Sequence, residues 1–373
     1  MIRRLAAQLV LPISSLFLAL VTGAVFVIAS SPLVTGEFDL GLPLDAYGAL
    51  VGGSLLSVNG WIDTLVNATP LILAGLSVGL CFKGGLFNIG AQGQTLVGAL
   101  AAAATGAALA QAPAPIAIGA AVAAAFLAGA AYGFIPGALK AFTGAHEVVV
   151  TIMLNYVAIQ VIAWAITGPL RAPGASFARS PDVGNAQLPA FGLPGHLLHA
   201  GVLLAIVAVP IVWWVLNRST VGFEVRTTGL NPDAARYAGM RPRLLTIGTM
   251  AVGGALAGLA GGAQILGVAG YMPAAYATNI GFDAITVALI GRANPIGIFF
   301  AALLLGGLRA GAPAMQISAG IPVQMIDVLQ GVMLFFLAAD VIVRRLFRLR
   351  NVEGGVDELQ TVSRTYGGQA TTN

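Results

Sequence analysis

The sequence contains few charged side chains. Asp, Glu, Lys and Arg make up 9% of its 373 residues, whereas about 25% is usual in a soluble domain. Hydrophobic residues make up 58%, and several apolar stretches are longer than the roughly 18 residues that indicate a membrane-spanning helix. This balance excludes an ordinary soluble protein. It predicts an all-α, polytopic membrane protein.

Residue types that carry chemistry are also scarce. The single cysteine, Cys81, excludes an intrachain disulfide and any multi-cysteine metal site. His196 and His199 lack the acidic partner or third ligand that a zinc site would need. The sequence contains no nucleophile-elbow, zinc-protease or Walker motif, so we predict no catalytic site, metal or cofactor in this chain. The net charge of +4 comes without a basic-aromatic groove, so we expect no nucleic-acid partner.

Glycine, in contrast, is abundant. The 49 glycines lie largely inside the apolar runs, and many recur every fourth residue. This spacing forms a smooth helical face that lets two helix backbones approach closely in a membrane. It therefore predicts a packed helix bundle but says nothing about a substrate. The stripes are Gly75 and Gly79; Gly129, Gly133 and Gly137; and Gly254, Gly258 and Gly262.

We expect about ten transmembrane helices, one of them a half-helix. The segment 281–291 is only about 16 Å long at 1.5 Å per residue, because Arg292–Pro295 breaks the apolar run. The segment 47–58 is too short to cross and predicts a surface-lying or half-inserted helix. The expected spans cover residues 9–31, 61–82, 87–110, 116–139, 147–167, 197–216, 244–266, 281–291, 296–310 and 323–343.

The distribution of basic residues predicts cytoplasmic N- and C-termini. With this topology only Arg171, Arg179 and Arg309 lie outside, so 15 of the 18 Lys and Arg lie inside. Residues 1–350 then form a transmembrane domain of the cell membrane, and 351–373 form a polar cytoplasmic tail that we expect to be disordered. The first apolar run is longer than the roughly 7–15 residues of a signal-peptide core, so we expect it to be retained as a span.

A hydrophilic interruption, residues 217–243, separates two long apolar runs. It carries five arginines against Glu224 and Asp233, which is typical of a cytoplasmic loop. Its middle predicts a short helix, because Asn231 can cap the start, Pro232 suits the first turn and Gly239 can end it. This pattern alone leaves open whether the segment is a docking element or an ordinary solvated loop.

Polar side chains gather at the start of the third span. Asn88, Gln92 and Gln94 lie among two glycine pairs in residues 83–94. This segment could be a discontinuous helix whose backbone and amides line a substrate path. Alternatively, it is a cytoplasmic turn in which Asn88 caps the span and a neighbouring helix satisfies Gln92.

Further polar residues lie inside the fifth and seventh spans. Glu147, Thr151 and Asn155 recur every four residues and share one helical face, which could point into a central cavity. Glu147 could instead complement the positive end of its helix, while Thr151 and Asn155 bridge helices. We favour this structural role for Glu147 and a path role for Asn155. Gln264 is a lone amide for which both roles stay open.

Four ordered segments resemble the permease subunits of bacterial ABC importers. They are similar to the simple-sugar/nucleoside branch, which is related to the ribose and branched-chain amino-acid permeases. One departure is His146, where Asn before Glu is more usual. The resemblance extends from about Asp63 to Arg344 and is carried by Gly75–Gln94, His146–Ala158, Gly229–Met240 and Leu289–Ile298.

The resemblance implies a translocation subunit that does not itself hydrolyse ATP. Gly229–Gly239 would be a coupling helix in a groove of a cytoplasmic ABC ATPase, which binds ATP and Mg. A second homologous permease, or a second copy, and an extracytoplasmic substrate-binding lipoprotein would complete the importer in the lipid membrane. Asn88, Gln92 and Asn155 match polar positions of the branch and are path candidates. The coupling candidates are Gly229, Asn231, Asp233, Ala234, Ala235, Arg236 and Gly239; the path candidates also include Glu147 and Gln264.

Several functions remain in competition at this stage. A nucleoside importer is the leading hypothesis, with a simple-sugar importer close to it. An ion-coupled secondary transporter belongs to a different class and would need titratable residues at the membrane midplane, which the sequence does not clearly supply. An assembly scaffold without transport is the third class.

Overall fold

The computed structural model describes residues 2–191, 198–276 and 278–338. These residues form two compact units, one built from the chain up to Ala68 together with the chain from Leu303, and the other from Thr69–Ala302. Helices α3 (Val58–Lys83) and α12 (Pro295–Ala319) each contribute to both units. The polar tail 351–373, the arginines after residue 338 that were predicted to be cytoplasmic, and His196 lie outside the described residues.

The first unit packs α1 (Ile2–Thr35), α2 (Leu42–Ser54) and α13 (Met325–Ala338) with parts of α3 and α12. The Tyr47 hydroxyl of α2 donates a hydrogen bond of 2.8 Å to the Leu20 carbonyl of α1. The expected surface helix 47–58 exists but begins earlier and ends at Ser54. Pro43 in the first turn explains the earlier start, because its fixed φ suits that position.

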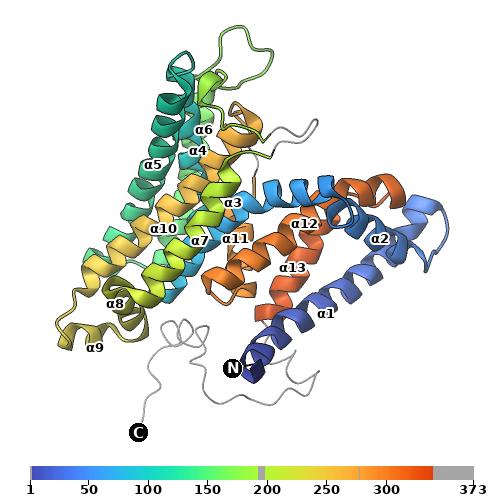
Figure 1. Cartoon of the computed structure of the whole chain (residues 1–373), viewed down its shortest axis with the longest axis horizontal. Coiled ribbons are helices and arrows are strands. Elements are labelled where there is room, and N and C mark those ends of the chain that lie inside the picture. The colour runs from blue at the N-terminus through green and yellow to red at the C-terminus, as the bar shows by residue number, and fades with distance from the viewer. Residues whose placement is uncertain (1, 192–197, 277, 339–373) are drawn as a thin grey trace. The chain divides into compact units, whose positions relative to one another are not determined.

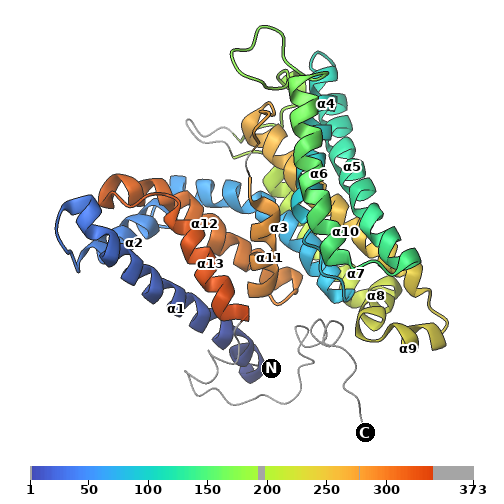
Figure 2. The same cartoon turned by 180° about the vertical axis from the view of Figure 1, so that it is seen from behind.

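The second unit holds the remaining helices (Figures 1 and 2). Figures 1 and 2 agree that α8 and α9 lie at one end of the bundle formed by α5, α7 and α10, whereas the loop after α6 lies at the other. The helices are α4 (Ala91–Ala108), α5 (Ala114–Thr143), α6 (Glu147–Thr167), α7 (Gly201–Arg218), α8 (Thr220–Leu230), α9 (Pro232–Tyr237), α10 (Pro242–Gln264) and α11 (Ile280–Ile290), with a π-helical turn at Ile265–Ala269.

The predicted glycine stripes pack helices α4, α5 and α10 together. A Cβ on Gly133 would lie 3.0 Å from the Gly254 Cα, and one on Gly129 would lie 2.8 Å from the Gly258 Cα. Gly98 of α4 meets Gly258 as well. Backbone contact at this range leaves no room for a side chain, so the stripes fix the spacing of the three helices. The bundle prediction is therefore confirmed.

The predicted break at Arg292–Pro295 is also present. Arg292 and Ala293 adopt left-handed φ values of 53° and 51°, which ends α11 because L-residues cannot continue a helix in that conformation. The Asn294 side chain then accepts a hydrogen bond of 3.0 Å from the Ile296 amide and starts α12. The return helix is longer than expected and extends to Ala319, so Arg309 lies inside it rather than at its end.

The long helices are suited to a membrane. Seven of the described helices are long and apolar enough to cross one, and Ile280–Ile290 and Met325–Leu337 are shorter apolar helices. α4, the expected third span, begins at Ala91 rather than at Phe87 and is less apolar, because Gln92 and Gln94 lie in its first turn. The chain is thus a polytopic, α-helical membrane protein, as predicted.

Candidate functional site

The interruption between α7 and α10 contains two capped helices. The Ser219 hydroxyl accepts a hydrogen bond from the Gly222 amide and caps α8. The Asn231 side chain accepts bonds of 3.0 Å from the amides of Asp233 and Ala234 and caps α9. The predicted short helix and its Asn231 cap are confirmed.

The end of α9 also follows the prediction. Gly239 has a φ of +82°, and its amide bonds the Arg236 carbonyl while the Met240 amide bonds the Ala235 carbonyl. This pair of bonds is a Schellman motif, which closes a helix at a left-handed residue. Glycine is suited to that residue because it has no Cβ.

Most of α9 is exposed. Only Ala235 is buried in this helix, and Tyr237 is 94% exposed. Asp233 and Arg236 form a surface ion pair of 3.7 Å, and Leu230 just before the helix is also exposed. A rigid, capped helix with an exposed apolar and aromatic surface can fill a groove of another protein, so this geometry suits docking.

The α8–α9 segment contacts the turn after α3 through backbone atoms. A Cβ on Gly229 would lie 2.6 Å from the Lys83 carbonyl oxygen and 2.7 Å from the Gly85 nitrogen. Gly85 has a φ of +69°, and a Cβ there would lie 2.7 Å from the Gly229 carbonyl oxygen. The two backbones are therefore in direct contact, and this contact ties the end of α8, next to α9, to the turn after α3.

Residues 84–90 lead directly into a buried amide cluster. Asn88 and Gln94 exchange two side-chain hydrogen bonds, of 2.9 and 3.2 Å. Both side chains are buried. Asn88 therefore does not cap α4 as one reading of the sequence expected, since the cap position is Gly90 and no side chain bonds there.

Gln92 joins α4 to the start of α11. Its side-chain oxygen accepts a hydrogen bond of 2.9 Å from the Gly281 amide. Its side-chain nitrogen donates to the Thr278 carbonyl. The Gln92 amide thus accepts from a backbone N–H in the first turn of α11, which a helix N-terminus would otherwise leave unpaired, and donates to a carbonyl just before that helix.

Asn155 of α6 has a similar role on the other side of α4. Its oxygen accepts a hydrogen bond of 2.7 Å from the Gly93 amide, and its nitrogen donates to the Ile89 carbonyl at 3.1 Å. The side chain is buried. Asn88, Gln92 and Asn155 therefore lie close together around the start of α4, but their polar atoms are bonded to the protein.

Glu147 begins α6 and is buried with an ion partner. Its carboxylate lies 2.6 Å from the Lys140 ammonium at the end of α5. This pair ties the two helices across the turn at 144–146. Gln264, in contrast, is half-buried at the end of α10, and its side chain makes no hydrogen bond within the parts of the chain that the structure describes.

The loop between α6 and α7 is fixed to the segment after α10. The Ser180 amide bonds the Met272 carbonyl at 2.8 Å, and the Ser180 hydroxyl accepts from the Met272 amide at 2.9 Å. Arg179 stacks over the Tyr271 ring at 4.6 Å and pairs with Asp182. This end of the second unit therefore carries an ordered surface opposite α9.

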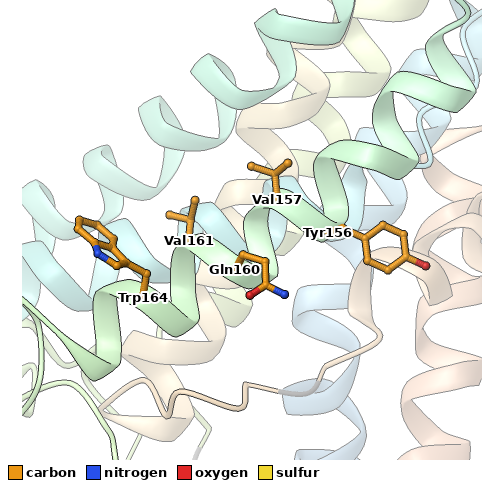
Figure 3. A pocket seen from close by; sticks show the side chains of 5 residues that line it. All are labelled: Tyr156, Val157, Gln160, Val161 and Trp164. Carbon is orange, nitrogen blue, oxygen red and sulfur yellow. The ribbon is translucent and has the colours of Figure 1, made fainter.

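One hollow lies on α6, where sequence reasoning placed no site (Figure 3). It is shallow, with a volume of about 410 Å³. The signal that could have found it is Gln160, an amide in the middle of an apolar span four residues from both Tyr156 and Trp164. The lining residues are Tyr156, Val157, Gln160, Val161 and Trp164.

Comparison with known proteins agrees with this architecture. Residues 60–338 match the model of the family described as "Branched-chain amino acid transport system / permease component". The guanosine ABC transporter permease protein NupP of Bacillus subtilis is 37% identical over 92% of this chain and 97% of its own length. The nucleoside ABC transporter permease protein NupB of Lactococcus lactis is 34% identical over 81% of this chain and 85% of its own.

A sugar permease is similar to nearly the same degree. The glucose ABC transporter permease protein TsgB13 of Haloferax volcanii is 35% identical over 79% of this chain and 80% of its own length. These relatives are all named as ABC transporter permease proteins, and the match extends over most of the helices described above. The chain therefore belongs to the permease family of the branched-chain amino acid type and is a multi-pass membrane subunit of an ABC transporter.

Proposed function

We propose that the chain is the translocation subunit of an ATP-driven importer of nucleosides. The observation that carries the proposal is α9, a capped and exposed helix whose neighbour Gly229 contacts the turn leading to the buried amide cluster. Such an element can receive force from a soluble motor and pass it into the membrane. The chain itself supplies the path.

The coupling step follows from this geometry. A cytoplasmic ABC ATPase would bind ATP and Mg and hold α9 in a groove. When the ATPases close, α9 would move and push the Gly84–Gly85 turn through Gly229. The side-chain hydrogen bonds of Asn88, Gln92 and Asn155 would then transmit the displacement to α4, α6 and α11. Because packed elements switch between discrete arrangements rather than deform gradually, a small shift can open one side of the path.

In this account the buried amides bind helices rather than substrate. Asn88, Gln92 and Asn155 already have protein partners for their polar atoms. They would keep the start of α4 in register while the bundle moves. Gln264 has a half-buried side chain without a described partner and remains our candidate for a path contact among these amides.

Nucleosides are the proposed substrate because two of the similar permeases are named for guanosine and nucleosides. Glucose is the second candidate, since TsgB13 is named for it and has similar identity. A second permease would complete the path. An extracytoplasmic binding lipoprotein would deliver substrate to the ordered loop surface around Arg179 and Tyr271.

The experiment is uptake of labelled guanosine and labelled glucose by cells that carry or lack the partner ATPase. We expect guanosine uptake that requires the ATPase and is not lowered by excess glucose. Uptake that survives loss of the ATPase would favour an ion-coupled transporter instead. ATPase-dependent uptake of glucose alone would keep the importer but change its substrate.

A further inference from the structure

The exposed face of α6 forms a continuous strip along the helix. Tyr156, Gln160 and Trp164 recur every four residues, so their side chains lie above one another. Tyr156 and Trp164 are 64% and 67% exposed, and Figure 3 shows the two rings at the ends of the hollow with the amide between them. The opposite face of α6 is buried in the second unit. We call these three residues the α6 strip.

The α6 strip lies at a depth in the membrane where contact between its polar groups and lipid is unfavourable. Tyr156 is the tenth and Gln160 the fourteenth residue of a helix of 21 residues. At 1.5 Å per residue they lie about 14 and 20 Å from its start, in the middle of a hydrocarbon layer about 30 Å thick.

Both residues carry polar groups without a partner at that depth. The Tyr156 hydroxyl and the Gln160 amide make no hydrogen bond to any residue in 2–191, 198–276 or 278–338. An unpaired amide in hydrocarbon costs free energy. Tyrosine facing lipid is normally found at the membrane surface rather than at the middle. The Tyr156 hydroxyl and the Gln160 amide therefore favour a polar neighbour at this depth, while apolar atoms make up almost all of the rest of the hollow's lining.

The chemistry of the strip fits a planar, polar ring. Aromatic side chains stack on any nucleobase because each base has a π-face. A glutamine amide offers a donor and an acceptor side by side, which matches the edge of a purine. A free sugar has neither a π-face nor such an edge. The hollow is open on the side away from α6, so it supplies only one wall.

We propose that the α6 strip contacts the base of a nucleoside during transport and that the second permease supplies the facing wall. This inference rests on the proposed function and names a site for its substrate. Tyr156 and Trp164 lie about 12 Å apart along the helix, so each ring stacks against the base in turn as it passes, and Gln160 bonds the edge of the base between them. Weak contacts on one wall guide the base through without holding it.

The first test uses thiol labelling in membranes that contain the whole transporter. Gln160→Cys is made in a Cys81→Ala background and treated with a charged methanethiosulfonate reagent. The matched control is Leu127→Cys, on an apolar exposed position of α5. Because the reactive thiolate forms in water, we expect Gln160→Cys to label at least about tenfold faster than the control. Equal rates would overturn the proposal.

The same assay then tests the base contact. Excess guanosine should slow labelling of Gln160→Cys, whereas excess ribose, which lacks a base, should not. Fast labelling that guanosine does not slow would leave a water-filled path without a base contact and would overturn the proposal. Guanosine uptake by the unsubstituted transporter is measured in parallel. If that transporter does not take up guanosine, the proposed function is wrong and the base contact is wrong with it. If it does take up guanosine, the labelling result tests the base contact alone.

Transport by ring variants provides an independent readout. We expect Tyr156→Leu to lower the maximal rate of guanosine uptake by about fivefold or more, which corresponds to the weakest measured stacking of a base. Tyr156→Phe keeps the ring and should stay within about twofold of the unsubstituted protein on the same grounds. Equal rates for the leucine and phenylalanine variants, at equal amounts in the membrane, would contradict stacking.

Discussion

The backbones of Gly85 and Gly229 are in van der Waals contact, so that a Cβ on Gly85 would lie 2.7 Å from the Gly229 carbonyl oxygen. The two residues are far apart in the sequence, one in the turn after α3 and the other in the last turn of α8. Neither can carry a side chain at this distance. The contact therefore joins the last turn of α8 to the turn that leads from α3 to α4.

This contact predicts that Gly85→Ala damages the protein more than a glycine substitution elsewhere. Gly144 is the matched control, because it has nearly the same φ, +71° against +69°, but no atoms within 4 Å of its Cβ position. A left-handed alanine costs about 1–2 kcal/mol at either residue, and only Gly85→Ala adds overlap with Gly229. We expect a larger fall in thermal unfolding temperature in detergent for Gly85→Ala. Equal falls would argue against the contact.

The cap of α9 predicts a graded effect on coupling. Asn231→Ala removes the acceptor for two backbone amides and should lower the stability of the helix by about 1 kcal/mol. Asn231→Asp keeps the acceptor and should behave like the unsubstituted protein. We expect reduced ATP-dependent uptake for the alanine variant at an unchanged amount in the membrane. Normal uptake would mean that α9 does not need to be preformed.

The exposed surface of α9 gives a sharper version of this test. Ala234→Asp places a charge on a helix that we propose to lie in an ATPase groove. This variant should stop uptake. It should also release the ATPase from the membrane fraction. Thr227→Asp is a control, because Thr227 lies on neighbouring α8, is half-buried and has its hydroxyl at the surface, bonded to the Phe223 carbonyl. Retention of the ATPase by the Ala234 variant would place the docking surface elsewhere.

Asn155 predicts a loss of stability as well as of transport. Asn155→Leu leaves the Gly93 amide and the Ile89 carbonyl without their partner, and each buried unpaired group costs about 1–3 kcal/mol. We expect a lower unfolding temperature and slower uptake, with unchanged affinity of the binding protein for substrate. Slower uptake at unchanged stability would instead support a direct path role for Asn155.

The Lys140–Glu147 pair predicts partial rescue by a second substitution. Lys140→Met leaves the buried Glu147 carboxylate without this cation, and because Lys140 is itself partly exposed, the cost should be below the about 3–5 kcal/mol of a fully buried pair. Adding Glu147→Gln removes the buried negative charge and should recover part of that loss. The measurement is the unfolding temperature of both variants in detergent. If the stability loss of the double variant equals the summed losses of the Lys140→Met and Glu147→Gln single variants, the two side chains are not coupled.

Local signals explain which elements could be predicted from the sequence. The break at Arg292–Pro295 and the ends of α9 depend on residues within a few positions of each other, as Asn231 and Gly239 illustrate. Capping and left-handed turns act over that range. The extension of α12 past Ala310 was not predicted, because Pro313 and the nearby glycines give weak helix signals that packing overrides.

The amide partners could not be predicted in the same way. Gln92 bonds Gly281, 189 positions away, and Asn155 bonds Gly93, 62 positions away. An amide in an apolar run shows that a partner is needed but does not identify it. The same pattern led us to favour a path role for Asn155, whereas the structure gives its side chain two backbone partners. Gln160 carried the same signal and stays exposed.

Uptake of labelled guanosine into proteoliposomes tests the central claim most directly. The vesicles would contain this permease, its partner permease, the ATPase and the binding protein, with ATP or a non-hydrolysable analogue supplied on the ATPase side. The account predicts accumulation against a gradient with ATP, none with the analogue, and none with ATP when the permease carries Ala234→Asp. Accumulation driven by an ion gradient in the absence of ATP would contradict it.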